Sequence, residues 1–98
     1  MTTTEDIRFV GDGVSLAGTL HRPAGQGPHP AIVMLQGSGP ADRDSDGYFP
    51  PIRDTFLGAG LAVLSWDKPG IGGSGGDWRE RTLRDRAHEA VDALAWLR

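Results

Sequence analysis

Glycine, serine and proline are concentrated in a short segment that directly follows an apolar run, and this segment points most clearly to chemistry. It reads Gln36-Gly37-Ser38-Gly39-Pro40 and follows Ala31 to Leu35. Because glycine lets the backbone approach a ligand closely, amide N–H groups in such a loop can converge on an anion. In acyl transfer that anion is the tetrahedral oxyanion, and one missing donor costs roughly 3 to 4 kcal/mol of transition-state stabilisation. The segment therefore favours a backbone oxyanion hole, with a tight turn that binds no ligand as the simpler alternative.

Charged residues continue this loop. Asp42, Arg43 and Asp44 come next, and Asp67 opens a second glycine-rich stretch that runs to Asp77. A planar guanidinium between carboxylates can hold a loop in one shape through charge-assisted hydrogen bonds. We expect these four residues to order the loops, with Arg43 structural rather than catalytic.

Ser74 lies in Gly72-Gly73-Ser74-Gly75-Gly76, a literal match to the G-x-S-x-G pattern of a nucleophilic serine. In a nucleophile elbow the strand turns directly into a helix at the serine. Ser74 instead lies eight residues after Trp66 and eight before Thr82, the expected start of the next helix. We therefore reject Ser74 as the nucleophile.

The same loop also contains Gly70-Ile71-Gly72-Gly73-Ser74-Gly75, which matches the G-x-G-x-x-G pattern of dinucleotide-binding proteins. Such a loop should open a helix at once, so that the helix N-terminus meets the pyrophosphate. Here residues 77–81 intervene. A nucleotide-binding βαβ module is kept as an alternative, and no cofactor is predicted.

Residues 42–47 fit the first half of a calcium-binding loop, with carboxylates at positions one, three and five and glycine at position six. Position twelve should be a bidentate glutamate but is Arg53, a cation. The three histidines show no spacing that would converge on a metal or a serine. No metal site is predicted.

The elements that would position these loops follow from hydrophobic patterning. Residues alternate around the turn Gly11-Asp12-Gly13, which indicates a β-hairpin. Two later runs are apolar throughout, as expected of parallel strands buried on both faces, and a helix between them makes a βαβ unit. The expected elements are strands near 7–10, 14–22, 31–35 and 61–66 and helices near 48–57 and 83–98. This is an α/β fold, a β-hairpin followed by β-α-β-α with parallel strands, in a single partial domain over residues 1–98.

The last predicted helix should begin at a capping box formed by Thr82 and Asp85. Its apolar stripe is predicted to consist of Ala87, Ala90, Val91, Leu94 and Leu97. The helical pattern continues to Arg98, and a crossover helix is normally followed by another strand. We therefore expect the chain to be one part of a larger sheet.

Composition excludes several classes of function. The formal net charge is −3 with no basic block, so nucleic acid is not an expected partner. The absence of cysteine rules out a thiolate nucleophile or thiolate metal ligands. The N-terminus has neither a basic nor an apolar targeting region, which leads us to expect a cytoplasmic protein with no membrane contact.

Several segments together resemble bacterial α/β-hydrolase esterases: the hairpin, the run Ala31 to Leu35, Gly37-Ser38-Gly39-Pro40-Ala41-Asp42-Arg43-Asp44, and Asp67-Lys68-Pro69-Gly70-Ile71-Gly72-Gly73-Ser74. The resemblance covers the N-terminal portion of such an enzyme. It implies that Ser38 donates its backbone N–H to the oxyanion, within the loop formed with Gly37 and Gly39. Many relatives carry His in place of Gln36 and Arg in place of Pro69.

The resemblance further implies a serine hydrolase that acts on carboxylic esters or thioesters through a serine, acid and histidine triad. All three triad residues would lie beyond Arg98, so the chain alone is expected to be inactive. In the order of strands typical of this family the third strand lies beside the fifth, which leaves residues 31–35 at an open sheet edge. We expect self-association or a complementing C-terminal chain at that edge.

Overall fold

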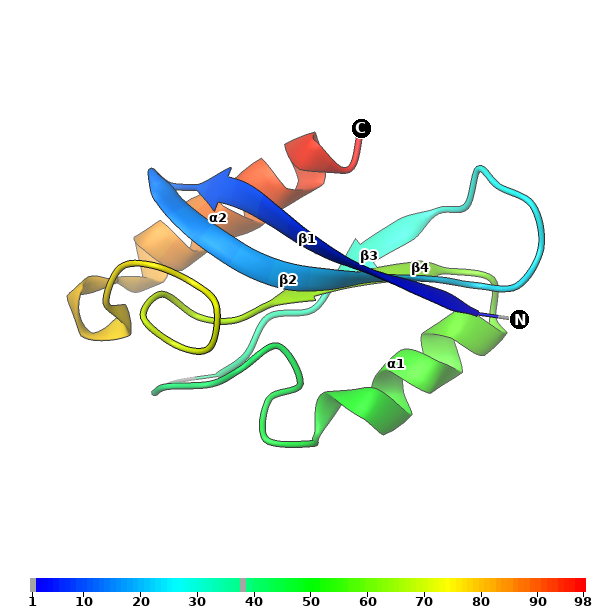
Figure 1. The fold of residues 1–98 in the computed structure, drawn as a ribbon, viewed down its shortest axis with the longest axis horizontal. Coiled ribbons are helices and arrows are strands. Elements are labelled where there is room, and N and C mark those ends of the chain that lie inside the picture. The colour runs from blue at the N-terminus through cyan, green and yellow to red at the C-terminus, as the bar shows by residue number, and fades with distance from the viewer. Residues whose placement is uncertain (1, 38) are drawn as a thin grey trace.

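The computed structural model describes residues 2–37 and 39–98, which form a sheet of four strands with one helix on each face (Figure 1). The strands are β1 (Thr3–Gly11), β2 (Val14–Arg22), β3 (Ala31–Val33) and β4 (Ala62–Trp66). The helices are α1 (Phe49–Gly58), α2 (Leu83–Trp96) and a short 3-10 helix, η1 (Trp78–Glu80). The predicted α/β class is confirmed.

The strands are arranged in the order β1-β2-β4-β3. β1 and β2 are antiparallel and meet at a turn where Asp12 and Gly13 have positive φ values of 49° and 78°, as the twist of a two-residue hairpin requires. β2 is antiparallel to β4, and β3 is parallel to β4. The predicted hairpin and the parallel βαβ pair are thus both present.

The observed bounds differ from the expected ones by two residues or more at three ends. β1 begins at Thr3, because polar residues before Ile7 continue the antiparallel ladder as far as the pair Thr3 and Arg22. Those residues are exposed, so no apolar signal marks them. β3 ends at Val33, although the Met34 N–H still donates to Leu64 O at 3.0 Å. α2 ends at Trp96, two residues before the last residue.

The core has two layers, one on each face of the sheet. On the α2 face, β1, β2 and β4 contribute apolar side chains that pack with Ala93 of α2. The rings of Phe9 and Trp66 meet there edge to face at 5.2 Å between centroids. On the α1 face, Val63 packs with residues of α1 and with Met34. Because β4 alternates between these layers, all five of its residues are buried, which explains its continuous apolar run.

The face of α2 that packs on the sheet agrees only in part with the predicted apolar stripe, of which Ala90 and Leu97 pack against the core. The buried residues of the helix are Glu89 and Ala93. Val91 and Leu94 of the predicted stripe are 62% and 44% exposed. The Glu89 carboxylate accepts a hydrogen bond from the Trp66 indole N–H at 3.1 Å, which turns this side of the helix toward β4. A buried polar contact thus joins the apolar contacts of Ala90, Ala93 and Leu97 on the face of α2 that packs on the sheet.

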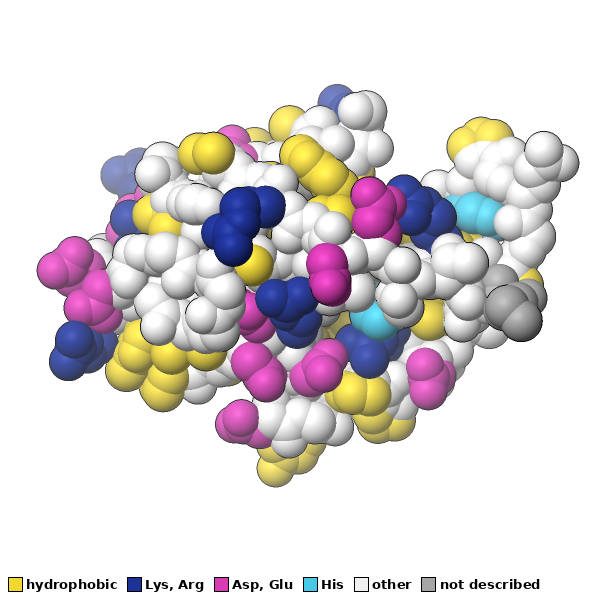
Figure 2. All heavy atoms as spheres, in the orientation of Figure 1, with side chains coloured by type: hydrophobic (Ala, Val, Ile, Leu, Met, Phe, Trp, Pro, Cys, Tyr) yellow, Lys and Arg dark blue, Asp and Glu magenta, His cyan; other side chains and the backbone are white. Residues whose placement is uncertain are grey.

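The surface carries acidic and basic side chains close together, and Figure 2 shows them interspersed on one face without a patch of a single sign. Several of these side chains form ion pairs, such as Arg22 with Glu5 at 2.8 Å. In the described part of the chain, no helix has the length and apolar character needed to cross a lipid bilayer.

Candidate active site

Two loops leave the carboxyl ends of the parallel strands β3 and β4, and Gln36 ties the first of them to the rest of the molecule. Its side chain is 8% exposed and makes three hydrogen bonds. Nε2 donates to Asp42 O at 2.7 Å and to Trp66 O at 2.6 Å. Oε1 accepts from Arg86 Nη2 of α2 at 2.9 Å. One amide thus links both ends of the segment 36–42 to β4 and α2.

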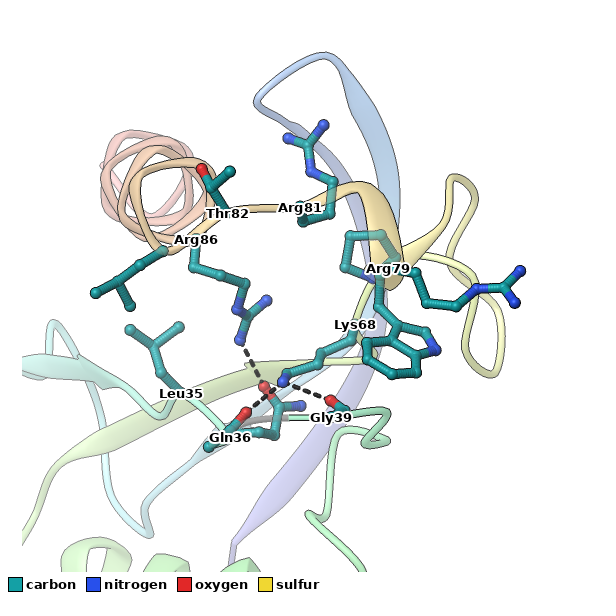
Figure 3. Close-up of a pocket in the computed structure, with 12 residues that line it drawn as sticks. Leu35, Gln36, Gly39, Lys68, Arg79, Arg81, Thr82 and Arg86 are labelled. Atoms are coloured by element: carbon teal, nitrogen blue, oxygen red, sulfur yellow. Dashed lines mark hydrogen bonds between the residues drawn. The ribbon is translucent and has the colours of Figure 1, made fainter.

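Lys68 reaches into the same loop from the residue pair that follows β4 (Figure 3). Its ammonium group donates hydrogen bonds to Gly37 O and to Gly39 O, the latter at 2.6 Å. Lys68 is only 5% exposed. Burial, together with the nearby positive charge of Arg86, lowers the pKa of Lys68. The cation therefore holds the carbonyls on both sides of position 38.

Arg43 and Asp67 form the ion pair that joins the two loops. Arg43 donates from Nη2 to Asp67 Oδ2 at 2.8 Å and from Nε to Oδ1 at 3.2 Å. The Arg43 N–H and the Gly73 N–H also donate to this carboxylate, at 2.7 and 3.0 Å. Burial alone would raise the pKa of Asp67, but the hydrogen bonds from Arg43 and Gly73 outweigh it and lower that pKa.

The structure therefore places the charged residues of the loop differently from the expected arrangement. Asp42 Oδ1 accepts hydrogen bonds from the Asp44 and Asp46 N–H groups, at 3.1 and 3.2 Å, as in an Asx turn. Asp44 pairs with Arg53 at 2.8 Å. Arg43 lies between Asp67 and, at 3.6 Å, Asp6, instead of between its two neighbours in sequence. Of the predicted oxyanion residues, Gly37 and Gly39 present their carbonyls to Lys68, and Ser38 lies outside the described residues.

A cavity of about 450 Å³ opens beside this loop. Its wall combines apolar side chains, among them Leu35 and Trp78, with Gln36, Lys68 and Arg86 (Figure 3). The cations are already engaged by protein groups, Lys68 by two carbonyls and Arg86 by Glu89 at 2.5 Å. The cavity thus offers an apolar wall next to a polar loop, which suits an acyl chain better than a free anion.

The second loop uses its polar groups internally. The Ser74 hydroxyl is 9% exposed, accepts from the Ala17 N–H at 2.9 Å and donates to Asp67 O at 2.7 Å. Gly70 N–H donates to Gly75 O, and Gly75 N–H donates to Ser15 O, both at 2.8 Å. These groups are all bonded within the protein. The geometry therefore supports neither Ser74 as a nucleophile nor this loop as a phosphate-binding site.

One group of metal-ligand side chains lies elsewhere, between the hairpin turn and α2. Asp12, Asp85 and His88 have ligand atoms within 4.8 Å of one another. Asp12 also pairs with Arg81, and Asp85 accepts the Thr82 N–H at 2.8 Å in the capping box. Both carboxylates thus already have protein partners, and Arg81 places a positive charge beside the group.

Sequence reasoning did not identify Lys68, Arg86 or Glu89 as parts of the site. Lys68 follows a strand and Arg86 lies one helical turn after the capping box, so no spacing connects them with the loop after β3. Glu89 offered a signal: a carboxylate beside Ala90 and Ala93 on a helix must find a partner if that face packs.

Comparison with known proteins identifies the family. The sequence model of the X-Pro dipeptidyl-peptidase (S15) family matches residues 12–98, most of the chain. The chain belongs to this family. A curated relative of this S15-family chain, the esterase FrsA of Enterobacter sp. (strain 638), is 32% identical over 97 residues, which cover 94% of the chain and 22% of FrsA. The chain thus spans about a fifth of the length of the curated relatives that it matches.

Solved structures confirm the α/β-hydrolase fold of this S15-family chain. The α/β hydrolase GrgF from Penicillium sp. sh18 superposes with a TM-score of 0.79 at 33% identity, covering 97% of this chain and 32% of GrgF. The esterase Pf2001 of Pyrococcus furiosus, at 23% identity, superposes with a TM-score of 0.78 and covers 97% of this chain and 34% of that one. The resemblance to the N-terminal part of an esterase-type α/β-hydrolase is therefore confirmed.

Proposed function

We propose that this chain supplies the oxyanion-binding loop of a serine hydrolase that acts on carboxylic esters or thioesters. The observation that carries the proposal is the pair of hydrogen bonds from Lys68 to Gly37 O and Gly39 O. A loop whose carbonyls are drawn to a buried cation has its amide groups free to serve another purpose, and the adjacent cavity has room for an acyl group.

Peptide geometry favours one donor within this loop. In a planar trans peptide the carbonyl oxygen and the following N–H point in opposite directions. The peptide unit after Gly39 ends in Pro40, which has no N–H. Of the two units whose carbonyls bind Lys68, only the one after Gly37 carries an N–H, and this N–H belongs to Ser38. This supports Ser38 as the donor that we propose.

The comparisons support acyl transfer as the class of reaction. The S15 family is named for a peptidase and the FrsA relatives for an esterase, and both reactions begin with attack on an acyl carbon. The oxyanion that forms is the same in either case. We propose an ester or thioester because the cavity next to the loop presents an apolar wall to the acyl group. The same proposal includes no cofactor and a cytoplasmic location, as the sequence predicts.

The experiment is a chimera in which this chain replaces the matching segment of FrsA, assayed with p-nitrophenyl butyrate and with Gly-Pro-p-nitroanilide. Ser38→Pro removes the N–H, and Ser38→Ala, the matched control, keeps it. We expect Ser38→Pro to lower kcat by roughly 100- to 1,000-fold. Ser38→Ala should stay within about threefold of the parent chimera. Equal activity of the two variants would contradict the proposal, and turnover of the anilide alone would change its substrate class.

The chain by itself is proposed to be inactive. A fluorophosphonate probe, which reacts with activated serines, should label the chimera and leave the 98-residue chain unlabelled. Labelling of the chain at Ser74 would contradict this part of the proposal.

A complementing role is the second candidate, and the open side of the sheet favours it. In the described ranges β3 has β4 as its one neighbour, so its other edge is unpaired. Next to it, Leu35, Val91 and Leu94 are exposed at 44%, 62% and 44%. Apolar edges of this kind pair with further strands. We propose that this edge joins a second chain or a second copy of this one.

Light scattering coupled to size-exclusion chromatography tests this role. The chain should run as a dimer or larger species that Val91→Glu, on the exposed side of α2, shifts toward the monomer. A monomer with a cooperative unfolding transition at all concentrations would remove the proposal. Asp92→Glu, on the same helix, is the control that should leave the distribution unchanged.

A further inference from the structure

Lys68 occupies an unusual environment for a structural cation. It is 5% exposed, and no described carboxylate lies within 4.0 Å of its ammonium group, whereas most of the arginines are paired. Its partners are two neutral carbonyls, and farther away lie the like charge of Arg86 and the opposite charge of Glu89. Burying an ammonium group without a counter-charge in direct contact is costly. A neutral donor would hold the loop at lower cost, so the positive charge calls for a further reason.

The position of the Lys68 charge gives a reason for its presence. A hydrogen bond donated to a peptide carbonyl polarises the whole unit and strengthens its N–H as a donor. Lys68 binds Gly37 O and therefore acts on the N–H at the other end of that unit. Its positive charge also favours an anion that develops at this loop.

Contacts from α2 hold the base of the loop that Lys68 binds. Arg86 Nη2 donates to Gln36 Oε1 at 2.9 Å, and Arg86 Nη1 donates to Glu89 Oε1 at 2.5 Å. Glu89 is fully buried and also accepts the Trp66 indole N–H at 3.1 Å. Glu89 thus fixes Arg86, and Arg86 fixes the base of the loop at Gln36. The charged groups that act on Lys68 are these two residues of α2, Arg86 and Glu89.

We propose that Lys68 is a positioning residue for acyl transfer, whose ammonium group orients and polarises the peptide unit after Gly37 so that its N–H stabilises the oxyanion. This inference rests on the function proposed above. In this role Lys68 makes no contact with the reacting atoms and acts only through the loop.

The first test uses the chain itself and follows the carbonyl carbon signals of Gly37 and Gly39 by NMR as pH is raised through the titration of Lys68. Both signals should move together with the Lys68 Nζ titration, while the carbonyl of Gly75 in the other loop should not. In Lys68→Met the two signals should be independent of pH. If the Gly37 and Gly39 signals of the unchanged chain do not change with the titration of Lys68, the inference is wrong. This measurement does not depend on the folding of any variant.

The second test measures kcat and KM in the FrsA chimera. Lys68→Met should lower kcat on the order of tenfold with KM unchanged, because the lost interaction belongs to the transition state. Lys68→Arg should restore kcat to within about threefold and move the alkaline decline of kcat to higher pH, because arginine stays charged. A Lys68→Met variant with full kcat, or the same alkaline decline in Lys68→Arg, would contradict the inference.

The two proposals fail in different ways. If Ser38→Pro and Ser38→Ala are equally active, the assignment of this loop as the oxyanion-binding loop is wrong. If only Ser38→Pro is inactive and Lys68→Met keeps its full kcat, the loop assignment stands and the role of Lys68 falls.

Discussion

The loop after β3 and the loop after β4 leave the same edge of the sheet but are held in shape by different means. The loop after β4 closes on its own backbone, with Gly70 N–H donating to Gly75 O at 2.8 Å and Ser74 N–H to Ile71 O at 3.0 Å. The start of the loop after β3 is held by the side chains of Gln36 and Lys68. The comparison suggests a division of roles, in which one loop is a scaffold and the other is shaped by it.

Asp67 joins the loop after β4, which is the scaffold, to the loop after β3. Its removal should therefore have the largest effect on stability. Its carboxylate is 4% exposed and accepts hydrogen bonds from Arg43 and from the Gly73 N–H. Asp67→Ala leaves Arg43 without its main partner and should lower the free energy of unfolding by about 3 to 5 kcal/mol, as measured by urea denaturation. Asp54→Ala removes an exposed carboxylate of α1 and is the control that should leave the transition midpoint unchanged. Equal effects of the two changes would break the comparison.

Gly72 should be nearly as sensitive, because a side chain there strikes the same carboxylate. Its φ is +54°, and a Cβ would lie 2.2 Å from Asp67 Oδ2. Gly72→Ala should therefore cost about 2 to 4 kcal/mol, from the positive φ and the displaced ion pair together. Gly75→Ala is the matched control, since its Cβ would lie 3.7 Å from Ser15 O, an ordinary contact. Thermal unfolding of both variants checks the prediction, and a control as unstable as Gly72→Ala would count against it.

Ser74→Ala tests whether this serine is part of the scaffold. The change removes the acceptor of the Ala17 N–H and the donor to Asp67 O in a buried position. The expected loss is about 1 to 2 kcal/mol in the free energy of unfolding. Fluorophosphonate labelling of the chimera should be unaffected. A loss of labelling with unchanged stability would instead make Ser74 a reactive group.

The smallest effect is expected from pH. Because the hydrogen bonds of Arg43 and Gly73 lower the pKa of folded Asp67 below its unfolded value, its contribution to stability is present above the unfolded pKa. That contribution is lost as pH falls through the folded pKa, so stability should decline below about pH 4. Urea denaturation at a series of pH values checks this. Asp67→Asn should show a shallower decline, and an unchanged slope would assign the acid sensitivity to other groups.

Local patterns were sufficient to predict most of the fold. The continuous apolar run at 61–66 predicted β4, and the capping box formed as expected, with Asp85 N–H donating to Thr82 Oγ1 at 3.2 Å. Both rest on residues close together in the sequence. The packed face of α2 was predicted only in part, because Glu89 is buried against Trp66, a contact between residues 23 positions apart, while Val91 and Leu94 are exposed.

The candidate site could be predicted only in outline. The position of the loop follows from the glycines after an apolar strand, but its anchors are distant in sequence, with 24 positions between Arg43 and Asp67 and 50 between Gln36 and Arg86. The sequence grouped Arg43 with three carboxylates without selecting its partner, since nothing in a single sequence indicates which of several carboxylates a guanidinium will meet. The glutamine at position 36 has a physical reason. An amide offers two donor hydrogens and an acceptor, and all three are used here.

Amide hydrogen exchange in Gln36→Ala and Ser74→Ala tests most directly whether one loop is the scaffold of the other. Lys68 N–H, which donates to Ala41 O across the loops at 3.1 Å, reports on the loop after β3, and Gly75 N–H reports on the loop after β4. Ala62 N–H, bonded to Pro30 O, corrects for global stability. Gln36→Ala should speed exchange at Lys68 by about tenfold and leave Gly75 unchanged, whereas Ser74→Ala should speed both. Equal acceleration of Lys68 and Gly75 in Gln36→Ala would contradict the account.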